Sequence, residues 1–115
     1  MLKENVLRYK KEFAVLYGRG KSIPERCLVL IYIKNHLPIK RRAFLASKKV
    51  GGAVQRNRAR RLLKESYRSV EENIVEGYDF VWIARRNIVQ LKCADVKKAM
   101  EAALKKAGLI KKSNG

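Results

Sequence analysis

Arginine side chains are concentrated in one short stretch of this sequence, where they alternate with apolar residues. The stretch holds Asn57 and Lys64 together with five arginines: Arg56, Arg58, Arg60, Arg61 and Arg68. A planar guanidinium group donates two parallel hydrogen bonds to a phosphate, whereas the lysine ammonium acts as a point charge. At about 100° per residue most of these side chains lie roughly opposite Ala59, Leu62, Leu63, Ser66 and Val70. The pattern predicts a helix over 54–72 that packs with one face and binds phosphates with the other.

The segment before this helix is also basic. Lys48 and Lys49 precede the pair Gly51-Gly52, so a positively charged bend is expected there. Between residues 40 and 68 the only acid is Glu65, whereas residues 69–84 contain acids and no base. A charge run is often just a solvated face, but concentration on one helix face and its bend favours a nucleic-acid surface. Such contacts supply affinity and little sequence information.

Two aromatic residues one helical turn apart are the second group with a chemical use. Phe13 and Tyr17 share one face of a helix expected over 10–18. Composition alone favours simple core packing for them. The alternative is a platform on which unpaired bases stack, because rings accept bases with little sequence preference. Trp82, in contrast, is expected in the core.

Residues suited to catalysis by the protein itself are scattered. Protein nucleases commonly use paired carboxylates with a metal ion, or histidine acid–base pairs. The sequence has His36 as its one histidine, and Cys27 and Cys93 lie far apart, without metal-ligand spacing. We interpret the cysteines as core thiols, and expect no catalytic or metal-binding residue. If the chain takes part in RNA cleavage, another component should supply the catalysis.

The composition fits a partner that is a polyanion. The 115 residues carry a formal net charge of +18, with a pI of about 10.4. Self-repulsion of this size opposes compaction, so RNA, DNA or an anionic membrane surface would be a natural partner. No apolar run approaches the roughly 20 residues of a membrane helix, and no signal-peptide pattern begins the chain. We expect a cytoplasmic protein without a membrane partner.

The elements that position these residues form a single domain over 1–115. Apolar spacing predicts helices over 10–18, 54–72 and 94–107, and strands over 27–34, 41–47 and 78–84. The strand 41–47 is expected to pair antiparallel with 27–34, and 78–84 to be central because it is apolar at both parities. Residues 1–6 and 109–115 are expected to be flexible. The order α-β-β-(β)-α-β-α gives an α+β sandwich with a mostly antiparallel sheet.

The segment 47–68 makes the functional interpretation specific. It reads Ser47-Lys48-Lys49, Val50, Gly51, Ala53-Val54, then Arg56-Asn57-Arg58, Arg60-Arg61 and Tyr67-Arg68. This spacing resembles the RNR signature of the bacterial ribonuclease P protein family. The resemblance extends to Phe13, Tyr17, Gly20 and Arg26–Ile33, to Ile83-Ala84-Arg85, and to the Lys-rich last helix. It covers roughly residues 7 to 107.

The resemblance implies a compact fold with a left-handed βαβ crossover, against the usual right-handed rule. It implies a complex with a large catalytic RNA that removes the 5′ leader of precursor tRNA, using Mg²⁺ held mainly by the RNA subunit. The protein alone would be inactive, and would be a monomer in the complex, with self-association left open.

Site residues carried over from the family fall into two groups. The implied RNA-subunit contacts are Lys48, Lys49, Arg56, Asn57, Arg58, Arg60, Arg61, Lys64 and Arg68. The implied leader contacts are Phe13, Tyr17 and Tyr32. The family commonly has a tyrosine at the position that aligns with Ile31. Tyr32 is adjacent, but on the opposite face of an ideal strand, so either residue is a candidate for the leader cleft.

Three other classes of protein fit part of these observations. A ribosomal protein would explain the size and charge but not the spacing within 47–68. A stand-alone nuclease would need the missing catalytic residues. A DNA-binding module would need base-reading side chains, and Gln55 and Asn57 are accompanied by arginines that are better suited to phosphate. We therefore expect RNA partners, namely ribonuclease P RNA and precursor tRNA, and no DNA.

Overall fold

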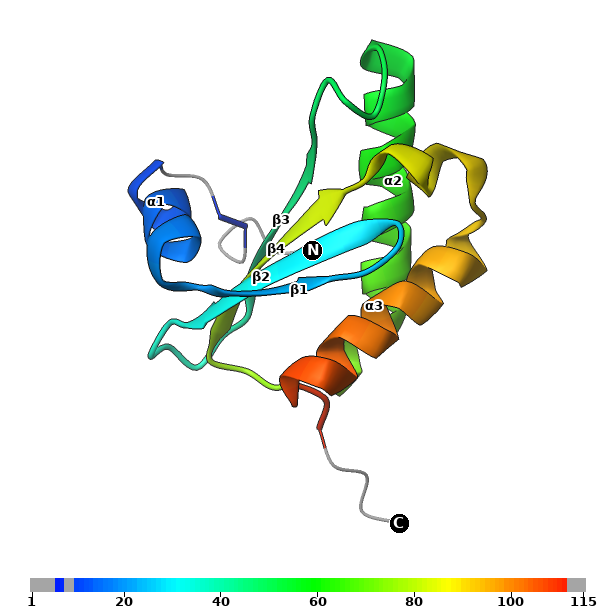
Figure 1. The fold of residues 1–115 in the computed structure, drawn as a ribbon. Coiled ribbons are helices and arrows are strands. Elements are labelled where there is room, and N and C mark those ends of the chain that lie inside the picture. The colour runs from blue at the N-terminus through cyan, green and yellow to red at the C-terminus, as the bar shows by residue number, and fades with distance from the viewer. Residues whose placement is uncertain (1–5, 8–9, 112–115) are drawn as a thin grey trace.

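The computed structural model describes residues 6–7 and 10–111, and within them three α-helices lie around one sheet (Figure 1). The elements are α1 Lys10–Arg19, β1 Lys21–Pro24, β2 Leu28–Lys34, β3 Arg41–Ala46, α2 Ala53–Val70, η2 Glu71–Asn73, β4 Tyr78–Ala84, η3 Arg86–Gln90 and α3 Cys93–Ala107, where η marks a 3-10 helix. The predicted helices and strands are confirmed, with ends that differ by one or two residues.

The strands form one mixed sheet in the order β1-β2-β4-β3. In the centre β4 runs antiparallel to β2, with Trp82 opposite Leu30, and parallel to β3, with Trp82 opposite Phe44. The predicted antiparallel pairing of 41–47 with 27–34 is therefore wrong. The two strands are not neighbours because β4 is apolar on both faces, and a strand buried on both faces takes the central position. It separates β2 from β3.

The optional strand in the predicted order is β1, and it precedes the two strands that the sequence indicated. It pairs antiparallel with β2 along the sheet edge. Its side chains are mostly exposed, and it ends at Pro24, which edge strands tolerate because proline cannot donate to a neighbouring strand.

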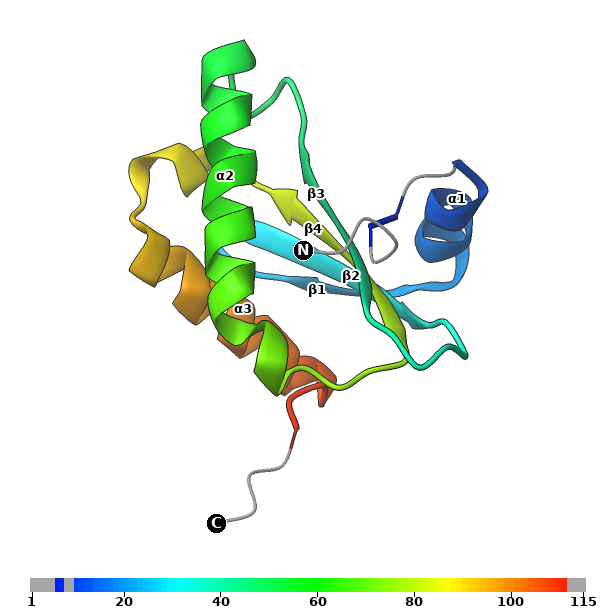
Figure 2. The ribbon, with the colours of Figure 1, turned by 180° about the vertical axis from the view of Figure 1, so that it is seen from behind.

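The connection from β3 through α2 to β4 is a βαβ unit, since β3 and β4 are adjacent and parallel. Figure 2 shows α2 in front of the sheet, with β4 to the left of β3 as both strands rise. The crossover is left-handed, as the resemblance implied, in contrast to the right-handed form of nearly all such units.

The two faces of the sheet are covered very differently. On one face α2 and α3 pack side by side, and the core between them and the sheet includes Leu30, Leu63, Trp82 and Met100, all fully buried. On the other face α1 lies alone, and its cluster contains few buried residues, among them Leu16 and Val81. We call these the closed face and the open face. Trp82 lies in the core, as predicted.

The end of α3 is set by Gly108, which adopts a left-handed conformation with φ of 73°. The amide of Leu109 donates to the carbonyl of Leu104, which is the hydrogen bond of a Schellman closure. Parts of the two ends predicted to be flexible lie outside the described residues. Of the rest, Leu109 is buried, and Ile110 forms an antiparallel bridge with Ile74.

Candidate nucleic-acid interface

The basic bend before α2 is built around a glycine that no other residue could replace without strain. The amide of Val50 donates to the carbonyl of Ser47 at 3.0 Å, and the buried Val50 side chain anchors the turn. Gly51 has φ of 147°, and a Cβ at this position would come within 2.8 Å of the Gln55 Cβ. The bend thus turns sharply into the helix and leaves Lys48 and Lys49 exposed.

Three of the predicted contact residues at the start of α2 also hold the local structure. Arg56 donates through Nη1 to the carbonyl of Gly51 at 3.1 Å, and Arg58 donates through Nε to the carbonyl of Val89 in η3 at 3.1 Å. Asn57 accepts a hydrogen bond from Arg60. Arg58 therefore extends toward η3, away from the open face, and its placement differs from that of Arg60.

The charge of this helix is uncompensated. Of the residues predicted to contact the RNA subunit, all are exposed except Arg56 and Arg60, which are half-buried. Across residues 6–7 and 10–111, the ion pairs involve Arg41 and Lys106 and none of the predicted contacts. No acidic residue lies in the first turn of α2, and its amide end has no side-chain cap. A polyanion would meet guanidinium groups that are already desolvated in part and not paired with carboxylates.

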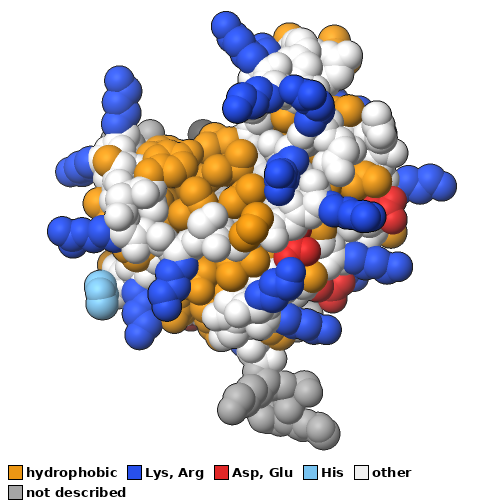
Figure 3. All heavy atoms as spheres, viewed as in Figure 1, with side chains coloured by type: hydrophobic (Ala, Val, Ile, Leu, Met, Phe, Trp, Pro, Cys, Tyr) orange, Lys and Arg blue, Asp and Glu red, His pale blue; other side chains and the backbone are white. Residues whose placement is uncertain are grey.

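A hollow of about 310 Å³ joins the two groups of predicted residues, which the sequence had treated separately. We call it the α1–α2 hollow. Phe13 of α1 lines one side, Arg60 and Lys64 of α2 line another, and β3 forms the floor. On the β1–β2 side of the molecule, Figure 3 shows apolar side chains gathered over the sheet beside α1, with Lys and Arg side chains around them. An aromatic ring and two cations thus border the same space.

The floor of this hollow contains a buried cation. Arg42 is 1% exposed, and its Cζ lies 5.9 Å from the centre of the Tyr67 ring. Burial, more than any nearby charge, raises the pKa of Tyr67 above its usual value, so this hydroxyl stays protonated. The buried guanidinium adds positive potential beneath the hollow, where water screens it weakly.

The side chains along one face of α1 are buried to different degrees. Leu16 is fully buried, Phe13 is half-buried, and Tyr17 is 54% exposed. The rings of Phe13 and Tyr17 stack with 6.5 Å between centroids and 26° between planes. Because Leu16 is the one fully buried side chain of α1, the two rings stay accessible and form a platform of the kind on which unpaired bases stack.

Two features fix α1 against the sheet. Gly20 lets the helix approach β2, since a Cβ there would lie 2.9 Å from Cγ2 of Ile31 and 3.1 Å from the carbonyl oxygen of Tyr32. Arg41 of β3 pairs with Glu12 of α1 at 2.6 Å and with Asp79 of β4 at 2.7 Å. The hydrogen bond to Asp79 is the main cause that raises the pKa of Arg41, so this guanidinium stays charged at any ordinary pH.

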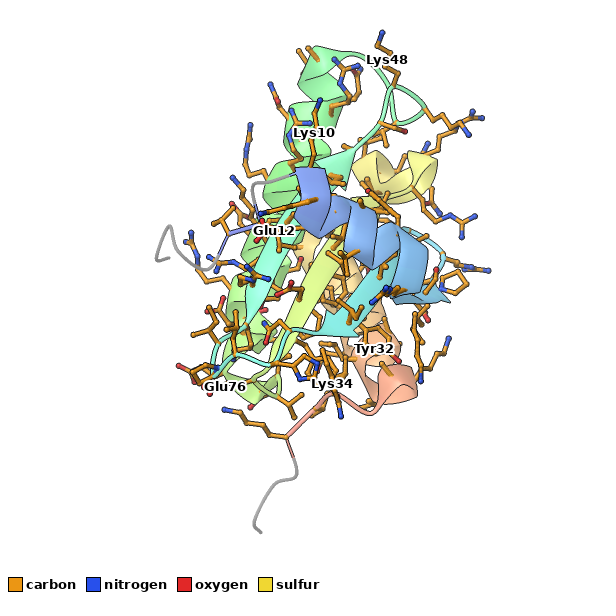
Figure 4. The ribbon with its side chains drawn as sticks, turned by 90° about the vertical axis from the view of Figure 1, so that its left-hand side faces the viewer. Lys10, Glu12, Tyr32, Lys34, Lys48 and Glu76 are labelled. Carbon is orange, nitrogen blue, oxygen red and sulfur yellow. The ribbon has the colours of Figure 1, made fainter. Side chains whose placement is uncertain are left out.

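Tyr32 does not share the face of Phe13. Ile31 packs with Phe13 on the open face, whereas Tyr32 points to the other side and lies beside Tyr78. Figure 4 shows Tyr32 and Lys34 near the C-terminal turn of α3, at the opposite end of the molecule from Lys48. The strand has no bulge at this point, so side chains alternate regularly. The structure thus places Ile31, and not Tyr32, with the leader candidates.

Three residues that line or support the hollow were not among the predicted contacts. Leu7 and Arg42 line it, and Arg41 holds α1 in place. The signal for the two arginines was present, because charges inside a predicted strand are unusual. The amide of Leu7 donates to the carbonyl of Arg42 at 3.0 Å, a contact that local sequence patterns do not reveal.

Two other kinds of functional feature are absent from the described residues. Within the described ranges, no three His, Cys, Asp or Glu side chains gather as metal ligands would. None of the described helices is both long enough and apolar enough to cross a membrane.

Comparison of the sequence with known families gives one consistent result. The family model described as Ribonuclease P matches residues 1–108. A ribonuclease P protein component of Clostridium botulinum, strain Langeland, is 48% identical over 109 residues, covering 94% of this chain and 98% of the relative. A protein of the same description from Pelotomaculum thermopropionicum is 43% identical over 103 residues, covering 90% and 92%.

The fold is also similar to solved structures. The RNase P protein of Staphylococcus aureus superposes with a TM-score of 0.81 at 25% identity, covering 91% of this chain and 96% of that one. The RNase P protein from Thermotoga maritima gives a TM-score of 0.78 at 26% identity, covering 87% and 94%. Both likenesses extend over nearly the whole sheet and its helices.

Proposed function

Since this chain belongs to the ribonuclease P protein family, we propose that it is the protein subunit of ribonuclease P and binds both the catalytic RNA and the 5′ leader of precursor tRNA. The complex removes the leader by endonucleolytic cleavage in the cytoplasm. The protein contributes binding and orientation, and the RNA subunit contributes catalysis. The α1–α2 hollow is the observation that carries this proposal, because it puts an aromatic ring, the cations of Arg60 and Lys64, and a buried cation around one space.

The RNA subunit lies along the basic bend and α2. Lys48, Lys49, Arg61 and Arg68 are exposed and form no ion pair with a described residue. Each contact with a phosphate releases counterions, so this surface should give binding that weakens steeply with salt. Arg56 and Arg58 use one donor each on backbone carbonyls and keep others for RNA.

The single-stranded leader lies on the open face, against Phe13, Tyr17 and Ile31. An unpaired base can stack on Phe13 while Arg60 and Lys64 hold its phosphate from the facing wall. These two residues therefore contact the leader and the RNA subunit at the point where both RNAs meet. Positive charge at this junction should reduce the Mg²⁺ that the complex requires.

Mg²⁺ belongs mainly to the RNA subunit in this proposal. The buried carboxylate of Asp79 accepts from Arg41 and Asn35, so its oxygens are already engaged. The protein would act on the ions indirectly, by bringing the two RNAs together.

The decisive experiment is cleavage of a 5′-extended precursor tRNA at low Mg²⁺, by the protein, by a bacterial ribonuclease P RNA, and by both together. The proposal expects activity in the mixture only. Cleavage by the protein alone would reveal a catalytic site in the chain, and a mixture no better than the RNA would favour a general RNA-binding role.

Two variants assign the surfaces. Arg60→Ala with Arg61→Ala should lower the slope of log affinity against log salt for the RNA subunit by roughly 1.5, because two phosphate contacts are lost. Lys98→Ala with Lys105→Ala removes the same charge from α3 and should leave the slope unchanged.

Phe13→Ala should weaken precursor tRNA binding more than mature tRNA binding, and equal losses would contradict leader stacking.

A further inference from the structure

A second hollow, which the proposed contacts do not use, lies by the C-terminal turn of α3. We call it the tyrosine pocket. It encloses about 360 Å³, within the range of sites that hold small organic groups, and Tyr32 and Tyr78 form part of its wall. The end of α1, the neighbouring ends of β1, β2 and β4, and the last turn of α3 meet there. Figure 4 shows this end of the molecule far from Lys48 and the basic bend.

The two tyrosine rings are arranged as a corner. Their centroids lie 6.2 Å apart with 58° between the ring planes, and both side chains are half-buried. Tyr78 is fixed from behind by Phe80, whose ring lies 6.2 Å away. A planar group could lie flat on one ring and meet the edge of the other, which is the geometry that aromatic pairs prefer.

Three cations border the same pocket: Arg19, Lys21 and Lys34. All three are exposed, and within the described part of the chain none of them takes part in an ion pair. None of the described residues that line the pocket is acidic. The potential there is therefore positive and favours an anionic group beside an aromatic one.

The end of α3 determines the orientation of such a ligand. Gly108 closes the helix in a left-handed conformation, so the negative end of the α3 dipole faces the pocket. A phosphate is disfavoured on that side and favoured near Lys21 and Lys34. The planar group would lie on the tyrosine side, where carbonyl oxygens at a helix end can accept from amino groups.

We propose that the tyrosine pocket binds one unstacked nucleotide of single-stranded RNA, with its base against Tyr32 and Tyr78 and its phosphate between Lys21 and Lys34. A duplex would not present a free base face, so the pocket selects unpaired segments. The inference rests on the proposed function, since it assumes that the protein works on RNA. It adds a second contact on the other side of the sheet from Phe13.

A site-specific fluorescence measurement tests the stacking. Tyr32→Trp puts an indole in the pocket, whereas Trp82, the one natural tryptophan, is fully buried. Titration with a short oligoadenylate should quench the variant and leave the unsubstituted protein nearly unchanged. The quench should persist in a Phe13→Ala background. Absence of a quench, or its loss with Phe13, would overturn the proposal.

Charge variants test the phosphate contact independently. In the Tyr32→Trp protein, Lys34→Glu should raise the oligoadenylate concentration for half-maximal quench about fivefold, in keeping with loss of a charged contact. Lys98→Glu makes the same charge change on the exposed surface of α3 and is the matched control. Equal effects of the two substitutions would mean that the positive charge of the protein attracts the oligoadenylate nonspecifically, and would contradict the proposal.

Binding measurements with two kinds of RNA identify which RNA supplies the nucleotide in the pocket. If the nucleotide comes from the leader, Lys34→Glu should weaken binding of a long-leader precursor and spare a short-leader one. If it comes from the RNA subunit, the loss should appear with that RNA alone. Because the quench uses a free oligonucleotide, it reads the pocket even if the protein does not assemble with ribonuclease P RNA. Cleavage by the mixture, in turn, tests assembly even if the pocket is empty.

Discussion

The closed and open faces of the sheet are built from similar apolar residues, yet they serve different purposes. On β2, Leu30 is fully buried under α2 and α3, while its neighbour Ile31 is only half-buried beside α1. Burial of the apolar side chains on the closed face stabilises the fold, and this stabilisation grows with the area removed from water. The open face keeps part of that surface accessible, and exposed apolar groups rimmed by cations are typical of binding sites. Burial, more than residue type, separates the two roles.

The largest expected effect comes from truncating the closed face. Leu30→Ala should lower the free energy of unfolding by about 3 kcal/mol, because it removes buried methyl groups and leaves a cavity. Ile31→Ala, on the next residue, should cost about 1 kcal/mol and should weaken precursor tRNA binding instead. Urea unfolding and tRNA binding measure the two effects. Similar losses in the free energy of unfolding would mean that the two faces contribute equally to stability.

A smaller loss of stability is expected from the link that joins α1 to the sheet. Arg41→Met should lower the free energy of unfolding by roughly 2 kcal/mol, because the Asp79 carboxylate, 7% exposed, then keeps only Asn35 as a side-chain partner among the described residues. Arg26→Met, at an exposed position, is the control and should change stability little. A loss no greater than the control would show that the ion pair does not hold the open face.

The open face can be altered with less effect on folding by moving α1. Gly20→Ala should cost about 1.5 kcal/mol and displace the helix, since the new Cβ would overlap the backbone of Leu16. Precursor tRNA binding should fall with it. Gly18→Ala is the matched control, because no atom lies within 4 Å of a Cβ there and alanine favours the helix. Loss of binding in both variants would contradict a positional role for Gly20.

The smallest effect is a difference in labelling rate that reports exclusion of water from the closed face. Burial is the main cause that raises the pKa of Cys27 above its usual value, so its thiolate is scarce at neutral pH. In a Cys93→Ala protein, alkylation of Cys27 should be at least about tenfold slower in buffer than in urea. Comparable rates would indicate that the core opens readily.

The sequence predicted the closed face well and the open face in part. Apolar spacing placed Leu62, Leu63 and Val70 in the core, since their periodicity matches the helix. It left open whether Ile31 or Tyr32 shares the face of Phe13, because a shift of one residue in register exchanges the faces of a strand. Nor could it show that Phe13 and Arg60 border the same hollow, which depends on how α1 is tethered through Arg41. Local sequence patterns determine which face of an element is apolar. The packing of elements that are distant in sequence determines which side chains line the same hollow.

The central position of β4 has a consequence for how the chain folds during its synthesis. The strand that separates β2 from β3 is the last to leave the ribosome, since it follows α2 in sequence. Until then β2 and β3 have no common neighbour, and the parallel pairing requires closure of the long connection through α2. A nascent chain that ends before Tyr78 would expose Leu28–Lys34 together with a concentrated positive charge. Such an intermediate is prone to misassociation, and an RNA held by its basic helix would protect it until the sheet is complete.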